Sequence, residues 1–279
     1  MTKQLLWLAL ALPLAAADNP TVEIETNFGK MTVELYADSA PNSVTNFLTL
    51  AGKGFYDGLA FHRIIKGFMA QGGDPAGDGS GGPTDAEGNR YCIPAEFNDR
   101  KHVRGTLSMA RTFEPNTGGS QFFLCFQDCG RLDEQYAVFG QMTSGDEVLA
   151  KIESDAASGN GTPRTAVKIV KMTVLTKLDP LPALVAYKES DTPFIGIDVD
   201  LSAQGRGVFV RATMPGGGAG NSGIQGGDTI EQVDGKGVKS LQDYAAAIAG
   251  MKPGDKKVFT VRRGDEAVDV TVTAEKFPE

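Results

Sequence analysis

Glycine divides this chain into short segments, and this pattern restricts the possible folds more than any other feature. The chain has 279 residues, of which 35 are glycine. The glycines gather with proline, asparagine and aspartate between short apolar runs. Because these residue types favour turns, the spacing is typical of many short strands. We therefore expect a mainly β protein, and the length suggests about two domains.

The first half of the chain predicts an antiparallel sheet with two helices. Alternating runs at 21–26 and 31–36 flank a turn and indicate a β-hairpin. Helices are expected after Pro41 and at 147–152. Further strand candidates are 61–65, 67–71, 105–109, 121–126, 136–142 and 167–175. So many short strands with two helices predict a closed antiparallel barrel of eight strands.

The composition changes between 176 and 192, and Pro180, Pro182 and Pro193 interrupt the strand pattern. We place a linker at 178–190, between a first domain at 20–177 and a second at 191–279. The second domain is expected to be a small β-barrel with a helix. Its predicted elements are a strand at 208–212, a glycine-rich turn at 215–220, a strand and turn at 227–235, a helix around 241–248 and a hairpin at 258–272.

The first residues, 1–17, resemble an export signal. Lys3 supplies a positive charge, 5–14 is apolar, and Ala15–Ala17 offers small residues for cleavage before Asp18. The apolar run is far shorter than the roughly 20 residues that span a bilayer. We therefore expect a cleaved signal peptide, no stable membrane span afterwards, and a periplasmic or secreted protein.

Charge and cysteine content exclude several other classes. The net charge is −8 and no basic block occurs, which argues against nucleic acid as a partner. With two histidines, three cysteines and no Cys-x-x-Cys spacing, a metal site is not expected, and no other cofactor is indicated. Cys125 lies in an apolar run and is interpreted as a core thiol. A disulfide between Cys92 and Cys129 is left open.

Several blocks resemble the cyclophilin family of peptidyl-prolyl cis–trans isomerases. The run FHRIIKGFMAQGGD at 61–74 resembles its signature, and blocks at 105–110, 115–123 and 132–140 follow in the family's order. The resemblance covers about residues 20–176. It implies an isomerase that acts on X–Pro bonds of unfolded or extended polypeptides and assists the folding of exported proteins. The alternative is a chaperone or adaptor that binds proline peptides without turnover.

Arg63, inside this signature, is the expected catalytic donor. An X–Pro amide rotates slowly because resonance gives its C–N bond double-bond character, with a barrier of about 20 kcal/mol. A catalyst must bind the twisted amide better than either planar form. Twisting localises a lone pair on the prolyl nitrogen, and a fixed donor there contributes roughly 2–4 kcal/mol. The guanidinium is always charged and presents a planar fork of donors, which suits this task.

The resemblance implies the rest of the site. The proline slot would be lined by Phe68, Met69, Phe123, Leu132 and Tyr136. The substrate backbone would be bound by Gln71, by Gln121 and by the main chain at Ala110 and Arg111. Of these residues, Gln71, Phe68 and Phe123 are grouped with Arg63 as catalytic. His62 is expected either to contact the substrate or to support Arg63, and His102 to be structural.

Three departures from the family pattern stand at the rim of the expected site. Arg131 replaces a frequent tryptophan, and Tyr136 replaces a common histidine. Because that tryptophan helps the family to hold cyclosporin, we expect weak cyclosporin binding with isomerase activity retained. The segment Thr112–Glu114 is one residue longer than in compact members of the family, which predicts a reshaped rim.

The second half resembles a PDZ domain of the circularly arranged kind found in bacterial exported proteases. The resemblance rests on the blocks at 193–197, 226–230 and 233–235. It implies that peptide C-termini or internal strands bind as an added strand. The implied groove residues are Phe194, Ile195, Gly196, Ile197, Leu241, Tyr244 and Ile248. A capped spacer without a ligand, and a module for oligomerisation or partner docking, are the alternatives.

Overall fold

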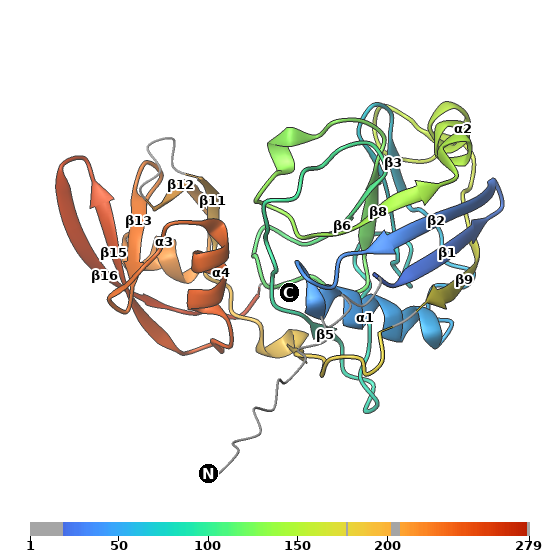
Figure 1. Cartoon of the computed structure of the whole chain (residues 1–279). Helices are drawn as coiled ribbons and strands as arrows, with labels where there is room; N and C mark the ends of the chain where they lie inside the picture. The colour runs from blue at the N-terminus through green and yellow to red at the C-terminus, as the bar shows by residue number, and fades with distance from the viewer. Residues whose placement is uncertain (1–18, 177, 202–206, 278–279) are drawn as a thin grey trace, which may run out of the picture.

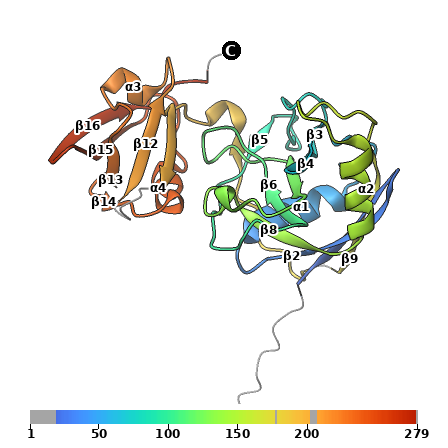
Figure 2. The ribbon, with the colours of Figure 1, turned by 90° about the horizontal axis from the view of Figure 1, so that it is seen from above.

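The computed structural model describes residues 19–176, 178–201 and 207–277, which form two lobes side by side (Figures 1 and 2). The signal peptide expected at 1–17 lies outside the described residues. Within those ranges, no helix is long and apolar enough to cross a membrane.

The first lobe is built on one curled antiparallel sheet of eight strands in the order β3-β4-β7-β6-β8-β2-β1-β9. The helix α1 (Pro41–Gly52) begins with proline in its first turn, as expected, and α2 (Asp146–Ala156) follows β8. The strands are β1 (Thr21–Thr26), β2 (Gly29–Leu35), β3 (Arg63–Ile65), β4 (Met69–Gly72), β6 (Thr106–Met109), β7 (Phe122–Cys125), β8 (Val138–Ser144) and β9 (Ile169–Thr176).

The sheet is open, so the closed barrel expected from the sequence is wrong. Strands β3 and β9 are the two ends of the order, and no ladder joins them among the described residues. Near this seam, the residues before the two strands are joined by an isolated bridge between Ala60 and Lys168 and by a few main-chain hydrogen bonds, such as the one from the amide of Phe61 to the carbonyl of Val167. Since β3 is only three residues long, it offers too short an edge to close the sheet against β9.

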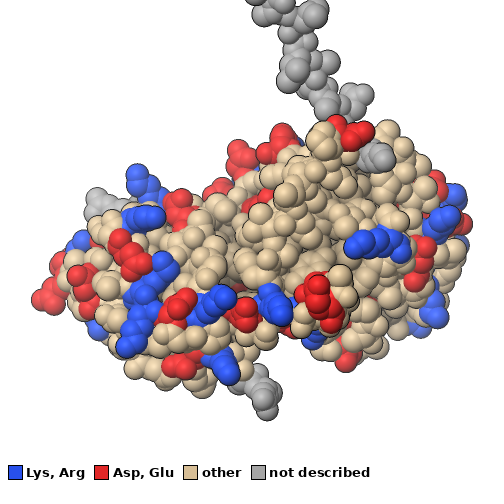
Figure 3. Space-filling view, turned by 90° about the horizontal axis from the view of Figure 1, so that it is seen from below, with Lys and Arg blue, Asp and Glu red and all other residues tan. Residues whose placement is uncertain are grey.

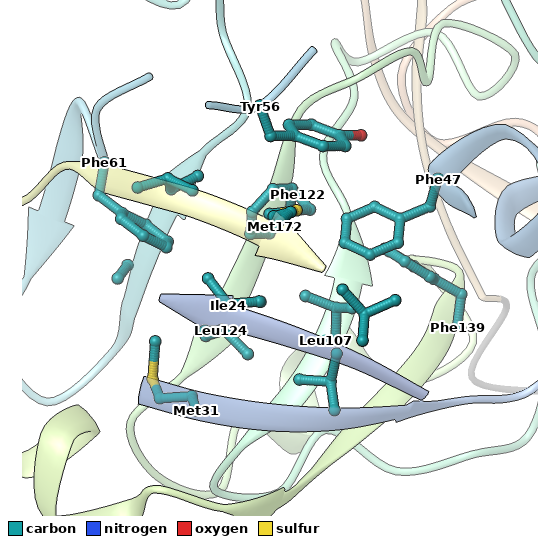
Figure 4. Packing of buried hydrophobic residues seen from close by; sticks show 14 of the residues in the cluster. Ile24, Met31, Phe47, Tyr56, Phe61, Leu107, Phe122, Leu124, Phe139 and Met172 are labelled. Atoms are coloured by element: carbon teal, nitrogen blue, oxygen red, sulfur yellow. The ribbon is translucent and has the colours of Figure 1, made fainter. Parts of the chain in front are cut away.

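Aromatic side chains fill the core between the sheet and α1 (Figure 4). The ring of Phe122 meets Phe47 of α1 edge to face at 5.5 Å, and it packs in the same way against Tyr56 and Phe61. Ile24 and Met31 contribute from the β1–β2 hairpin, which the sequence predicted correctly. This packing fixes β7 with Phe122 inward, so its neighbour Phe123 must project from the opposite face.

The second lobe holds a smaller antiparallel sheet in the order β11-β12-β13-β15-β16, with β14 paired to β13. The closing hairpin and the helix at 241–248 are confirmed, and Ser240 caps that helix with Asp243 in a capping box. Strand β11 was not expected from the sequence. The elements are β11 (Ile197–Leu201), β12 (Val208–Thr213), α3 (Gly218–Ser222), β13 (Thr229–Val233), β14 (Lys236–Gly237), α4 (Leu241–Ile248), β15 (Lys256–Arg263) and β16 (Glu266–Thr273).

The segment between the lobes is held against the first lobe. Its strand β10 (Tyr187–Lys188) pairs with β5 (Tyr91–Cys92). The side chain of Asn42 exchanges two hydrogen bonds with the main chain of Val185. Arg90 and Glu189 form an ion pair at 2.8 Å. These contacts make the connection a docked strand, which limits how freely the second lobe can move.

Candidate active site

Three neighbouring strands bring the polar part of the candidate site together. Arg63 of β3 lies opposite Gln71 of β4, and Gln71 lies opposite Phe123 of β7. Directly opposed residues of antiparallel strands project from the same face of a sheet. The sequence therefore places a cation, an amide and an aromatic ring in one row on the face opposite the core.

A chain of hydrogen bonds fixes the polar side chains of this row. Arg63 Nη1 donates to Gln71 Oε1 at 3.3 Å, and Gln71 Nε2 donates to Gln121 Oε1 at 2.9 Å. Gln121 Nε2 then donates to the carbonyls of Gly79 and Gly81. Each amide is thus oriented by its neighbour, and the chain of hydrogen bonds connects the Arg63 guanidinium to the main chain of the loop at Gly79 and Gly81.

An apolar cluster lies beside the row. Met69, Phe123 and Ala110 are buried in it, and the ring of Phe123 meets Tyr136 edge to face at 5.8 Å. The partly buried side chains that complete the cluster are Ile65, Phe68, Leu132 and Tyr136. All five residues expected from the sequence to line a proline slot thus lie in one cluster, together with the buried thiols of Cys125 and Cys129.

His102 packs against Phe123 of this cluster, as a structural residue. Its ring is fully buried and stacks on Phe123 with the centroids 6.0 Å apart. Nδ1 lies 3.1 Å from Asp133 Oδ1, and Nε2 lies 3.0 Å from Ser108 Oγ. Burial lowers the pKa of His102 despite the nearby carboxylate. The neutral ring therefore sets the position of Phe123.

Arg111 forms one wall of the site. Its guanidinium lies 4.6 Å from the centroid of the Tyr136 ring and donates to the carbonyl of Gln135 at 2.9 Å. It also donates to the carbonyl of Phe113 at 3.0 Å. Burial lowers the pKa of Arg111. The arginine thus links the aromatic cluster to the loop that follows it.

A pocket of about 210 Å³ opens next to the row. Its lining includes Gln71, Ala110, Arg111 and Gln121, which belong to the candidate site, and also Gly81, Arg90 and Glu189. Because part of the lining is shared with the site, a peptide bound at the apolar cluster could extend into this pocket.

His62 and Arg131 stand apart from the row. His62 is partly buried beside the loop that carries Asp74 and Asp78, and burial lowers its pKa. Its Nδ1 has no hydrogen-bond partner among the described residues. The guanidinium of Arg131 lies 4.4 Å from the centroid of the Phe68 ring, over the edge of the apolar cluster.

The seven groove residues expected in the second lobe are also gathered in one place. All are buried, and they lie where β11, α4 and the loop 194–197 meet. Gly196 has φ +73, and a side chain there would collide with Gly217. This conformation favours glycine. Strand β11 pairs with β12 alone among the described strands, so its other edge faces the groove.

Sequence reasoning missed Glu114. Its Oε1 accepts a 2.6 Å hydrogen bond from the amide of Gly196 in the second lobe. The extra length of the segment 112–114 was the available signal, but nothing local indicated where its side chain would point.

The cysteines are free thiols, and Cys92 lies in β5 while Cys129 lies in the apolar cluster, so the pair left open above is not bonded. Among the described residues, no three side chains of the metal-ligating types His, Cys, Asp and Glu are grouped so that they could hold an ion. On the face shown in Figure 3, acidic and basic side chains are interspersed without a continuous basic area.

Comparisons with known proteins assign each of the two lobes to a family. The family model described as cyclophilin type peptidyl-prolyl cis-trans isomerase/CLD matches residues 21–174, and the PDZ domain model matches 193–274. A peptidyl-prolyl cis-trans isomerase of Helicobacter pylori is 51% identical over 132 residues, 47% of this chain and 78% of the relative. One from Synechococcus elongatus is 48% identical over 147 residues, 53% of this chain and 94% of the relative.

A solved structure gives the same result for the first lobe. The crystal structure of a Cryptosporidium parvum cyclophilin type peptidyl-prolyl cis-trans isomerase superposes with a TM-score of 0.53 and 35% identity. The match covers 57% of this chain and 99% of that one. A second structure from that organism, in the presence of the dipeptide ala-pro, gives a TM-score of 0.52 with 56% of this chain and 99% of that one covered.

Proposed function

The chain belongs to the cyclophilin-type peptidyl-prolyl cis–trans isomerase family and carries a C-terminal PDZ domain, and we propose that Arg63 is the donor that stabilises the twisted X–Pro amide. The observation that supports this role is the relay from Arg63 through Gln71 to Gln121 beside the apolar cluster. A preorganised donor requires no reorganisation when the amide twists, which is why it favours the transition state over both planar forms.

The apolar cluster is the proposed seat of the proline ring. Phe123 would form its floor, with Met69 and Phe68 on one side and Leu132 and Tyr136 on the other. A ring held there leaves the carbonyl side of the amide free to rotate, which isomerisation requires. The amide of Ala110 already donates to the carbonyl of Gln121 at 3.0 Å, so the carbonyl of Ala110 is the main-chain group that a substrate would use. His62, the neighbour of Arg63 in the chain, has a supporting role in this scheme.

The test of Arg63 is a protease-coupled assay on a short X–Pro peptide. Arg63→Ala should lower kcat/KM by about 10²–10³-fold, the effect of removing one preorganised donor. Arg164→Ala removes an exposed arginine that bonds the carbonyl of Ser154, and it should leave the rate unchanged. Equal rates for Arg63→Ala and wild type would refute the catalytic role.

For the PDZ domain we propose the docking of peptides with a free C-terminal carboxylate. The amides of the loop 194–197 would bind the carboxylate, and the peptide would add as a strand to the free edge of β11. Apolar side chains between β11 and α4, among them Ile197, Leu241 and Ile248, suit an apolar last residue. Docking would raise the local concentration of substrate at the isomerase domain.

We also propose that this isomerase assists the folding of exported proteins. The support is the signal-like sequence at 1–17, with small residues before Asp18. N-terminal sequencing of the protein recovered from an export-competent bacterial host is the test. A mature chain starting at Asp18 is expected, and an intact leader in the cytoplasm would refute export.

A further inference from the structure

The carboxylate-binding loop of the PDZ domain holds a carboxylate from the isomerase domain. Glu114 Oε1 accepts the amide of Gly196 at 2.6 Å, and the amide of Ile195 is close enough to favour the charged form of this carboxylate. The Glu114 side chain is only 1% exposed although it lies on a loop between β6 and β7. A buried loop carboxylate against two successive backbone amides occupies the position in which a PDZ domain receives a peptide terminus.

Residues around Glu114 cover the rest of the groove. Asn116 Nδ2 donates to the carbonyl of Ala245 in α4 at 2.9 Å. The amide of Phe97 donates to Gln242 Oε1 at 2.7 Å, and the Phe97 ring is part of the second lobe's core. Phe113 meets Phe194 edge to face with the centroids 5.7 Å apart. The contacts therefore run from the carboxylate loop along α4, which is the length that a bound peptide would need.

We propose that the segment 113–116 is an internal ligand of the PDZ domain, and that a peptide with a free terminal carboxylate and an apolar last residue docks by displacing it. This inference rests on the peptide-docking function proposed above. It deepens that function because it states what must leave the groove before a peptide can enter, and it places the regulation in the isomerase domain.

The internal ligand fits the groove imperfectly, which allows displacement. Glu114 Oε2 is buried without a hydrogen-bond partner among the described residues, and so is the hydroxyl of Tyr244 on α4. A buried acceptor left unpaired costs its full desolvation. The segment also leaves β11 with β12 as its one strand partner in the described chain. An extended peptide would add ladder hydrogen bonds along that edge, which the internal ligand does not supply.

The same loop enters the isomerase site. Ala110 and Arg111 line the pocket beside the Arg63 row, and Arg111 donates to the carbonyls of Thr112 and Phe113. Moving 113–116 out of the groove therefore changes the partners of Arg111. Occupancy of the PDZ groove and the shape of the substrate pocket are coupled through one short segment.

The test compares peptide binding by the full chain and by Glu114→Ala. The probe is a fluorescein-labelled pool of short random peptides that end in valine, leucine, isoleucine or phenylalanine with a free carboxylate, read by fluorescence anisotropy. An amide-capped pool is the ligand control. Glu147→Ala, an exposed glutamate of α2, is the matched variant. In the closed arrangement Glu114→Ala leaves the Gly196 amide without an acceptor, so we expect at least about tenfold tighter binding.

Hydrogen exchange provides a readout that needs no peptide. The amide of Gly196 should exchange slowly in wild type and in Glu147→Ala, and faster in Glu114→Ala. If both wild type and Glu114→Ala bind the free-carboxylate pool with equal affinity, or if exchange is unchanged while the pool binds, the internal ligand is overturned and peptide docking stands. Faster exchange without binding of the pool by any variant overturns peptide docking, while the Glu114 contact stands.

Discussion

Peptide binding to the PDZ groove should depend on pH through Glu114. Burial raises the pKa of Glu114 from 4.5 to about 7, although the amides of Gly196 and Ile195 and the charge of Arg111 act in the opposite direction. When the loop leaves the groove, the carboxyl returns to water and to its ordinary pKa. The difference of about 2.5 units corresponds to about 3 kcal/mol.

The sign follows from which state has the higher pKa. The docked loop binds its proton more tightly, so docking is strongest below about pH 4.5, weakens as the pH rises to about 7, and is constant above that. The charged or titratable groups facing Glu114 are Arg111 on its own loop and Tyr244 on α4. Arg111 stays protonated and the pKa of Tyr244 is raised by burial, so neither changes charge in this range. Between about pH 5 and 7.5 the docking constant should fall by about 50-fold.

The assay is the anisotropy titration with the free-carboxylate pool at several pH values and constant ionic strength. The wild-type affinity for peptide should rise with pH by up to the same factor of about 50. A peptide's terminal carboxylate titrates near pH 3.5 and stays ionised throughout. Glu114→Gln keeps the size of the side chain and cannot titrate, so its affinity should be flat. A flat wild-type profile, or the same slope in Glu114→Gln, refutes the reasoning.

Two further outcomes are expected. Arg131→Trp replaces the guanidinium over Phe68 with an indole. Since aromatic contacts add about 1 kcal/mol, cyclosporin should inhibit the variant at least about fivefold more strongly than wild type in the X–Pro assay. Unchanged inhibition would show that another residue determines drug sensitivity. Phe122→Ala removes a ring that is 1% exposed in the core, and it should lower the free energy of unfolding in urea by about 4 kcal/mol; a loss below about 1 kcal/mol would show that the core collapses into the space.

Local periodicity carried most of the fold prediction. The hairpin at 21–35, α1 and α4 follow from alternation, an early proline and helical spacing, which are encoded within a few residues. Strand β11 was missed although its apolar residues alternate with Asp198 and Asp200, which is a strand signal. Closure of the first sheet could not be predicted in this way, because it depends on whether two strands distant in sequence present edges of sufficient length.

The same distinction between local and long-range features applies to the candidate site. The two-residue spacing of Met69 and Gln71 places both on one face of β4, and the structure has them there. The relay to Gln121 and the stacking of His102 on Phe123 join distant segments, so spacing alone did not reveal them. The contact of Glu114 with the second lobe could not be predicted from the sequence, since it depends on how two separately packed cores meet.

A tethered ligand can regulate the groove even when it binds poorly. Linking two partners gives the internal one an effective concentration in the millimolar range. If the segment 113–116 bound with an intrinsic Kd of about 10 μM at an effective 1 mM, it would weaken every external peptide by about 100-fold. A peptide that adds a strand to β11 can still displace the segment, while a peptide that contributes only a carboxylate cannot. Because coupling between two sites is reciprocal, a substrate that stabilises Arg111 in its present position would also favour the closed groove.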